Sequence, residues 1–294
     1  MATFQQWVAG ARPRTLFAAV APVVMGTAAA AQHSTPSYAI AILAAVVALA
    51  LQVGVNYAND YSDGIRGTDD SRVGPVRLVG QKLASPESVR AGAFLTFGFA
   101  AITGLALVAL SEAWWLLPLG VASIIAAWKY TGGDKPYGYL GLGEVFVFIF
   151  FGLVATLGTM YAETGALSWF SLAGAVGVGA IASAILVVNN LRDIPTDTES
   201  GKHTLAVRLG EQGTRYLWFG LIVVSIIALA VMAIWEIWAL LGLLSVAAIH
   251  RAIHVVMGGA EGRRLIPVLG STGRYELAYA VAVFAGVLLS RALA

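Results

Sequence analysis

The sequence contains no cysteine and little charge, and both absences narrow what the chain can be. Without cysteine, disulfides, thiolate catalysis and iron–sulfur ligation are excluded, although the redox compartment stays open. Charged residues make up only 12% of the 294 residues, whereas 59% are hydrophobic, and the mean hydropathy is +0.79. A soluble domain of this size could not bury that much apolar surface. With a net charge of only +2, we expect the lipid bilayer, and no nucleic acid, as a partner.

The sequence contains several long runs of apolar residues. A helix needs roughly 20 mostly apolar residues to cross a bilayer, and continuous rather than alternating runs favour helices over a barrel. The first run lacks a small-residue cleavage site, so it is kept as a span. Residues 1–294 therefore predict a single all-α, polytopic membrane helix bundle with nine transmembrane helices around a central cavity. The nine expected spans are 16–32, 38–58, 91–111, 114–130, 142–162, 169–189, 216–235, 237–256 and 275–291.

The distribution of basic residues predicts the orientation. With the N-terminus in the cytoplasm, seventeen of the eighteen Lys and Arg residues fall on the inner side and only Arg291 lies outside. Such an excess is typical of cytoplasmic loops, so we expect a multi-pass protein of the cell (inner) membrane with its C-terminus outside. All seven aspartates share the inner side. The long, charged inner loops are 59–90, 129–141, 190–215 and 251–274, and Ser85-Pro86-Glu87 predicts the start of a short helix in the first.

Two acidic segments stand out, each directly after a long apolar run. The first is Asn59-Asp60-Tyr61-Ser62-Asp63, and the second begins Asn189-Asn190-Leu191-Arg192-Asp193. A shift of 130 residues superposes Asn59 on Asn189 and Asp63 on Asp193. The chain therefore looks like a duplicated helical unit whose two acidic ends converge across a central cavity at a wet membrane surface.

The spacing of these residues predicts cation binding. Residues at i and i+4 share one face of a helix, so each Asn–Asp pair can hold one cation. Mg²⁺ prefers oxygen ligands and usually borrows phosphate oxygens. One such pair is more often solvated or a helix cap, but two copies on one membrane face favour a metal–phosphate site. Pro195 cannot continue an ordinary helix without losing a hydrogen bond, so a shared face for Asp193 and Asp197 stays open.

Basic residues of the same loops are candidates to surround a diphosphate. Charge builds on the diphosphate oxygens as the leaving group departs, so cations stabilise the transition state more than the ground state. Each basic residue alone is as readily explained by topology. The candidates are Arg66, Arg72, Arg77, Lys82, Lys135, Arg192, Lys202 and Arg208.

The inner loop 129–141 combines aromatic and flexible residues. It contains Tyr130, Lys135, Tyr137 and Tyr139 among several glycines. Aromatic faces can stabilise a passing carbocation, but an interfacial aromatic belt explains them equally well. Glu144 lies just inside the next apolar run, where carboxylates are costly and usually functional.

One further pattern, His250 and His254 at helical spacing, could hold a metal or haem. Haem that spans a bilayer needs ligands from facing helices. Only His33 and His203 remain elsewhere, so no matching pair exists.

At Asn59-Asp60-x-x-Asp63 and Asp193-x-x-x-Asp197, the chain resembles the two aspartate-rich motifs of the UbiA superfamily of intramembrane prenyltransferases. The resemblance runs nearly end to end, and members have nine transmembrane helices. The common first motif continues to another Asp where this chain has Gly67, and the next acids here are Asp69 and Asp70. That departure is similar to the branch that prenylates 1,4-dihydroxy-2-naphthoate, as are Ala11–Leu16, Pro136–Glu144 and Gly201–Gly210.

The resemblance implies a mechanism. Two Mg²⁺ ions, held by Asn59, Asp63, Asp193 and Asp197 with help from Asp60 or Asp69, would grip a polyprenyl diphosphate that ionises to an allylic cation. Asn189 joins this set through the duplicated motif, and Lys202 is expected to contact the diphosphate. The family's Tyr-and-Lys element falls on Tyr130 and Lys135, one residue further apart than usual. The naphthoate ring would then attack the cation, and carbon dioxide would leave as demethylmenaquinone forms.

Other functions share parts of this pattern. A sister-branch enzyme acting on 4-hydroxybenzoate, homogentisate or haem would keep the metal site and differ in the aromatic pocket. A secondary transporter could also show duplicated halves, but transporters usually place ionisable residues near the midplane, whereas charges here crowd at one surface. Prenyl length, oligomeric state and the acceptor-pocket residues stay undetermined.

Overall fold

The computed structural model describes residues 2–67 and 76–294, and throughout these residues the regular structure is helical. In chain order the helices are α1 Phe4–Gly10, η1 Pro13–Thr15, α2 Phe17–His33, α3 Tyr38–Ile65, α4 Pro86–Ser111, α5 Leu116–Lys129, η2 Tyr137–Leu140, α6 Gly143–Val147, η3 Phe148–Val154, α7 Ala155–Thr164, α8 Trp169–Glu199, α9 Leu205–Met232, η4 Ile237–Ser245, α10 Val246–Met257, η5 Gly262–Leu265 and α11 Ile266–Leu293. The predicted all-α class is confirmed.

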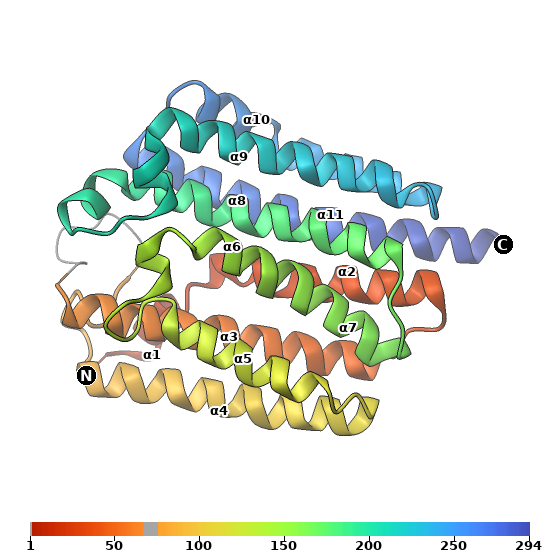
Figure 1. The fold of residues 1–294 in the computed structure, drawn as a ribbon, viewed down its shortest axis with the longest axis horizontal. Coiled ribbons are helices and arrows are strands. Elements are labelled where there is room, and N and C mark those ends of the chain that lie inside the picture. The colour runs from red at the N-terminus through yellow and green to blue at the C-terminus, as the bar shows by residue number, and fades with distance from the viewer. Residues whose placement is uncertain (1, 68–75) are drawn as a thin grey trace.

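The long helices lie side by side along the longest axis of the molecule (Figure 1). The long connections that follow α3, α5 and α8 gather at one end, which also holds the N-terminus; we call it the loop end. The C-terminus and the short turns lie at the opposite end, here named the turn end. The two acidic segments close α3 and α8, and so both lie at the loop end.

Seven helical segments in the described part of the chain are long and apolar enough to cross a membrane. Two further apolar helices, α2 and α5, are shorter, and α5 has only 14 residues. At 1.5 Å per residue α5 is about 21 Å long, less than the roughly 30 Å of bilayer hydrocarbon. Each of the nine predicted spans falls on a helix, although α3, α8, α9 and α11 extend seven to eleven residues further at one end. By length and apolar composition, seven helical segments of the described residues are membrane-spanning.

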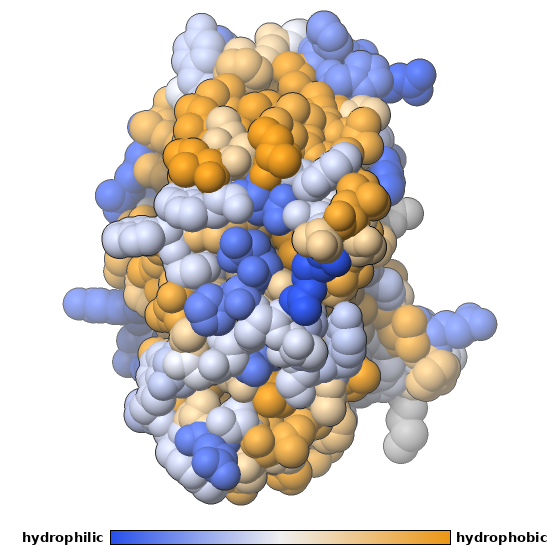
Figure 2. Space-filling model, turned by 90° about the vertical axis from the view of Figure 1, so that its right-hand side faces the viewer, coloured by the Kyte–Doolittle hydropathy of each residue, from blue (hydrophilic) through white to orange (hydrophobic). Residues whose placement is uncertain are grey.

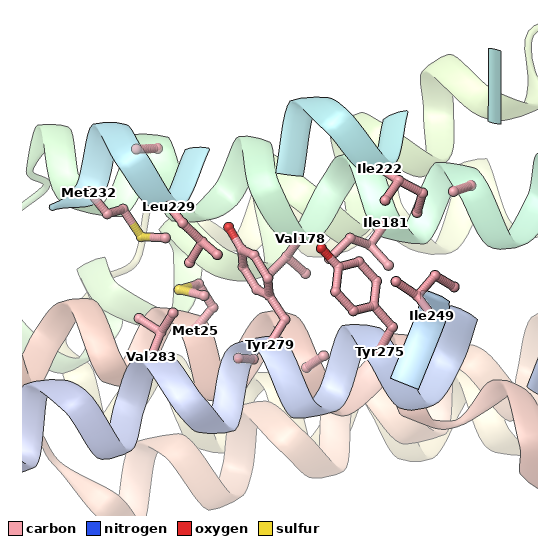
Figure 3. Close-up of a cluster of buried hydrophobic side chains, with 14 of the residues drawn as sticks. Met25, Val178, Ile181, Ile222, Leu229, Met232, Ile249, Tyr275, Tyr279 and Val283 are labelled. Carbon is pink, nitrogen blue, oxygen red and sulfur yellow. The ribbon is translucent and has the colours of Figure 1, made fainter. Parts of the chain in front are cut away.

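Helix α8 is the centre of the bundle, because 72% of its most apolar 18-residue stretch is buried. Figure 3 shows Tyr275 and Tyr279 of α11 lying among Val178, Ile181 and Ile222. The Tyr279 hydroxyl donates to the Ser225 backbone oxygen at 3.0 Å. This buried hydroxyl therefore finds its partner inside the apolar core, where no water is available to bind it.

Small residues set the distance between α8 and its neighbours. A Cβ at Gly152 would lie 2.6 Å from the Gly179 Cα, and one at Gly177 would lie 2.3 Å from the Tyr279 hydroxyl oxygen. Gly152 belongs to η3, a π-helical stretch that joins α6 to α7. Close glycine contacts of this kind are common between membrane helices.

The structure corrects one local expectation and decides a second point that the sequence left open. Ser85 caps α4 with Pro86 as its first residue, as predicted, but this is the start of the long helix α4 rather than of a separate short one. Pro195 lies inside α8, which continues to Glu199. A proline near a helix end removes one hydrogen bond without breaking the helix, so Asp193 and Asp197 share one helix.

The turn end carries a belt of exposed tryptophans. Figure 2 looks onto this end, where pale and orange residues dominate and strongly hydrophilic ones are scattered. The exposed tryptophans next to the turns are Trp114, Trp115, Trp169, Trp235 and Trp238. Tryptophans commonly concentrate at membrane–water interfaces.

Candidate active site

A cavity of about 1060 Å³ lies between the helices and carries polar residues at the loop end. Asn59 and Asp63 from the last two turns of α3 line it, and so do Asn189 and Asp197 from the end of α8. Apolar side chains such as Leu107 line the rest of the cavity. The predicted convergence of the two acidic helix ends on one cavity is therefore present in the structure.

Asp63 is the centre of the first acidic segment, and only 2% of it is exposed. The Tyr139 hydroxyl donates to its Oδ1 at 2.6 Å, and the Lys202 Nζ lies 3.4 Å from the same atom. The Arg77 guanidinium lies 3.9 Å from Oδ2. Asp63 thus joins three loops that are far apart in the sequence.

Polar contacts hold the loop 129–141 against the first acidic segment. The Thr131 hydroxyl donates to the Asn59 Oδ1 at 2.8 Å, and Arg66 at the end of α3 donates to the backbone oxygens of Thr131 and Gly133. The Lys202 Nζ also lies 4.5 Å from the centre of the Tyr139 ring, a cation–π contact. These contacts fix Tyr139 over the carboxylate of Asp63.

Backbone contacts close the loop after α8 over the same place. The His203 N–H donates to the Tyr139 oxygen at 3.1 Å, and the Lys202 N–H donates to the Asp197 oxygen at 2.8 Å. Gly141 has a φ of +75°, and a Cβ there would lie 3.2 Å from the His203 oxygen. Only glycine adopts this conformation at so close an approach without strain.

The second acidic segment is paired with an arginine from the same segment. Arg192 donates to both carboxylate oxygens of Asp193 at 2.7 Å and to the Asn189 Oδ1 at 2.9 Å. The Asn189 Nδ2 also donates to Asp193 at 3.4 Å, which confirms the predicted shared face. Both Asp193 and Asp197 are buried, so the expected wet surface is wrong for them and for Asp63. Arg77, Tyr139 and Lys202 cover the carboxylate of Asp63, and Arg192 covers that of Asp193.

Most of the predicted site residues meet at the cavity. Those that line it are Asn59, Asp63, Arg77, Tyr130, Tyr137, Tyr139, Asn189, Arg192, Asp197 and Lys202. Asp193 is next to it through Arg192. Asp69 and Arg72 were predicted as well, and they lie outside the described residues.

Asp60 has another role. Its carboxylate accepts the backbone N–H groups of Leu78 at 2.5 Å and of Val79 at 3.1 Å, and it does not line the cavity. Asp60 lies on a different side of α3 from Asn59 and Asp63. It therefore anchors the segment that carries Arg77, and its assignment as a metal ligand is not supported by its position.

Three predicted substrate-binding cations also lie away from the cavity. Lys135 and Arg208 are exposed, and Arg208 donates to the His203 backbone oxygen. Arg66 holds the loop 129–141, as described above. Glu144 is buried behind the cavity wall, where Asn190 donates to it at 2.9 Å.

Sequence reasoning missed several residues of the cavity. Arg12 and Thr15 precede α2, and Gln52 and Asn56 continue the polar face of α3 towards the turn end. The Asn56 Nδ2 donates to the Ala11 oxygen at 2.9 Å and to the Thr15 hydroxyl at 3.2 Å. The four-residue spacing of Gln52 and Asn56 before the acidic segment was a signal that could have identified them.

Aromatic side chains form one wall of the cavity. The Tyr137 and Phe146 rings stack with centres 4.0 Å apart, and Tyr130 meets Tyr137 edge-on at 5.5 Å. Burial raises the pKa of Tyr137, so it remains a neutral donor to the Ala126 oxygen at 2.9 Å. The wall offers aromatic faces rather than charges.

The oxygen donors fit a hard divalent cation in kind and in charge. Asn189 and Asp193 already converge on one cationic group, and Asp63 faces two. No cluster of three or more His, Cys, Asp or Glu residues occurs in the described part of the chain. Amide and phosphate oxygens would have to complete the coordination, which is usual for Mg²⁺.

Comparison with known proteins places this site in a family. The model of the UbiA prenyltransferase family matches residues 19–265. The 1,4-dihydroxy-2-naphthoate octaprenyltransferase of Mycobacterium tuberculosis is 54% identical over 288 residues, which cover 98% of each chain. The enzyme of the same name from Escherichia coli is 38% identical over 231 residues, covering 76% of this chain and 75% of that one.

Solved structures agree at the level of the fold. A UbiA homolog from Aeropyrum pernix matches 94% of this chain and 98% of its own, with a TM-score of 0.69 and 16% identity. A UbiA homolog from Archaeoglobus fulgidus bound to GPP and Mg²⁺ matches 95% of this chain and 99% of its own, with a TM-score of 0.60 and 14% identity. By its sequence and by its fold, the chain belongs to the UbiA prenyltransferase family.

Proposed function

We propose that this protein transfers a polyprenyl group from polyprenyl diphosphate to 1,4-dihydroxy-2-naphthoate. The 54% identity to the naphthoate octaprenyltransferase of Mycobacterium tuberculosis over nearly the whole of both chains carries the proposal. One carbon–carbon bond forms, while diphosphate leaves the prenyl carbon and CO2 leaves the naphthoate. No oxidant takes part, so the immediate product is the quinol of demethylmenaquinone. Membership of a prenyltransferase family decides against the transporter alternative.

The metal would bind between the two acidic helix ends. Asn59 and Asp63 on one side, and Asn189, Asp193 and Asp197 on the other, supply oxygen ligands of the kind that Mg²⁺ prefers. When bound, the cation acts as a Lewis acid that stabilises charge on the departing diphosphate. The Mg²⁺ bound in the Archaeoglobus fulgidus homolog supports this choice of metal.

Basic residues of this chain would hold the diphosphate. Lys202 and Arg77 are buried beside Asp63 and line the cavity, and Arg12 lines it as well. Their charges stabilise the diphosphate more strongly as its bond to carbon breaks, because negative charge then accumulates on its oxygens.

The remaining wall would hold the organic parts. The faces of Tyr130, Tyr137 and Phe146 lie where an allylic cation can be stabilised by aromatic rings. The apolar part of the cavity, which extends between the helices away from the loop end, would take the prenyl chain. A prenyl chain is a hydrocarbon, so it would bring no polar group into this part of the cavity.

The test is product formation by the purified protein. Incubation in lipid with a polyprenyl diphosphate, Mg²⁺ and 1,4-dihydroxy-2-naphthoate should give a prenylated, decarboxylated product by mass spectrometry, and a chelator should abolish it. Product with 4-hydroxybenzoate or homogentisate, and none with the naphthoate, would overturn the acceptor while keeping the metal site.

The proposed topology has nine spans, with the loop end in the cytoplasm and the protein in the cell (inner) membrane. The absence of cysteine makes a direct test possible, because a single introduced thiol is the only target for a maleimide. In right-side-out vesicles, Thr35→Cys at the turn end should react with an impermeant maleimide and Lys135→Cys should not. Labelling of Lys135→Cys alone would reverse the orientation.

A further inference from the structure

A buried pair of polar side chains joins the second acidic segment to helix α6. Glu144 and Asn190 are each only 7% exposed, and the Asn190 Nδ2 donates to the Glu144 Oε1 at 2.9 Å. Glu144 is in the first turn of the helix that begins at Gly143, and Asn190 follows Asn189 on α8. Within residues 2–67 and 76–294, no hydrogen bond or ion pair joins either side chain to Asp63, Asp193 or the basic residues that would hold the diphosphate.

Of the two, only Asn190 lines the cavity. Asn190 donates through its Nδ2 to the Glu144 Oε1, so the amide nitrogen faces the carboxyl group of Glu144. The Asn190 Oδ1 is then the end of the amide that is left for the cavity. The bond to Glu144 is the one side-chain hydrogen bond that Asn190 makes within the described residues.

The surroundings of Asn190 suit an aromatic molecule with a hydroxyl group. Leu186, one turn before Asn190, lines the cavity together with Tyr137 and Phe146, whose stacked rings were described above. Asn190 follows Asn189, a proposed metal ligand, and the two side chains differ by about 100° around α8. A group bound at Asn190 therefore lies beside a diphosphate held at the acidic helix ends without using the same side chain.

We propose that Glu144 orients Asn190 so that the Asn190 Oδ1 accepts a hydrogen bond from a ring hydroxyl of the naphthoate acceptor. This inference rests on the proposed function and names the acceptor-binding residue of that site. Asn190 is the residue that touches the substrate, and Glu144 is a positioning residue that acts through it.

The contact favours the reaction as well as binding. When the ring attacks the allylic cation, positive charge spreads onto the ring and makes its hydroxyl a stronger donor. The hydrogen bond to the Asn190 Oδ1 therefore strengthens in the transition state.

The first measurement uses the unmodified protein and compares 1,4-dihydroxy-2-naphthoate with its two mono-methyl ethers. One ether lacks the hydroxyl that Asn190 would bind, and kcat/KM for it should fall about 10- to 100-fold relative to the other. The Asn190→Leu variant should show the same loss with the parent acceptor and little further loss with the sensitive ether. Equal rates with both ethers would overturn the proposal.

The second measurement exchanges donor and acceptor within the pair. Asn190→Asp places two carboxylates together and should lose activity, whereas Glu144→Gln combined with Asn190→Asp restores a donor–acceptor pair and keeps an oxygen for the substrate. The double variant should regain at least tenfold in kcat/KM for the naphthoate over Asn190→Asp, with the KM for prenyl diphosphate unchanged throughout. An absence of rescue, or an equal change in both KM values, would contradict the assignment.

Ser183→Ala is the matched control, because Ser183 is equally buried and donates to the backbone oxygen of Glu144 at 3.2 Å without lining the cavity. It should leave the naphthoate KM unchanged. If the unmodified protein prenylates no naphthoate at all, the proposed function falls together with this inference. If it does so and the variants leave the acceptor KM unchanged, the inference alone is wrong.

Discussion

The two acidic segments have the same Asn-x-x-x-Asp spacing, yet they are neutralised in different ways. Asp63 on α3 takes its partners from other loops: Arg77, Tyr139 and Lys202. Asp193 on α8 takes Arg192, its immediate neighbour, in a two-point contact at 2.7 Å. The contacts of Asp63 thus depend on tertiary structure, whereas the pairing of Asp193 with Arg192 is local in the sequence.

The difference separates two tasks that one motif performs. Around Asp63, cationic groups at 3.4 to 3.9 Å are close enough to neutralise the carboxylate and far enough to turn towards a substrate. Around Asp193, the short paired contact fixes the end of α8. We therefore expect substitutions in the first segment to act mainly on turnover, and those in the second to act on stability as well.

The largest effect is expected from removing either carboxylate. Asp63→Asn and Asp193→Asn should each lower kcat by at least about 10²- to 10³-fold, the loss typical of a charge-stabilising group. Asp193→Asn also leaves Arg192 buried without its carboxylate, which should cost about 3–5 kcal/mol of stability. Steady-state rates and thermal unfolding in detergent measure the two effects, and equal unfolding temperatures for the two variants would refute the distinction.

Lys202→Ala should act on one substrate. Lys202 is buried, lines the cavity and lies 3.4 Å from Asp63. Its loss should raise the KM for prenyl diphosphate about tenfold and leave the KM for naphthoate unchanged, because Lys202 would bind the diphosphate and not the carboxylate of the naphthoate. An unchanged KM for prenyl diphosphate would mean that Lys202 contributes only to the membrane topology.

Tyr139→Phe should have a smaller effect. It removes the 2.6 Å hydrogen bond to Asp63 but keeps the ring beneath Lys202. A single hydrogen bond to a charged group contributes about 1.5–3 kcal/mol, so we expect a lower unfolding temperature and a modest fall in kcat. Tyr139→Ala, which also removes the ring, should lose more in both assays, and the order of the two variants is the check.

The smallest effects are expected at Lys135 and Arg208. Both were predicted to bind substrate, but both are exposed and neither lines the cavity. Lys135→Ala and Arg208→Ala should change kcat/KM by less than about threefold, because exposed charges interact weakly. A tenfold loss in either variant would show that the loop end closes further over bound substrate.

Much of the fold could be predicted from the sequence because membrane helices are local. Each predicted span falls on a helix, since a run of apolar residues must satisfy its own backbone in lipid. The count of spans was less secure, because α2 and α5 are helical and apolar but short. The acidic spacing likewise predicted which oxygens share a helix face, as the contact from Asn189 to Asp193 confirms.

The direction in which side chains point could not be predicted. Asp60 is next to Asn59 in the sequence, yet it faces the backbone of Leu78 and Val79 instead of the cavity. Glu144 was expected to touch substrate, but it lies behind Asn190. Adjacent positions on a helix differ by about 100°, so the identity of the facing element decides what each residue meets.

By itself, the sequence determined that this is a helical membrane protein with two acidic helix ends and a set of oxygen ligands suited to a divalent cation. Apolar length and i, i+4 spacing act over a few residues and so can be read along the chain. Only the tertiary structure decided that Arg77, Tyr139 and Lys202 meet at Asp63, and that Asn190 lines the cavity while Glu144 does not. Those contacts join residues from different helices and loops, and packing of the whole bundle sets their distances.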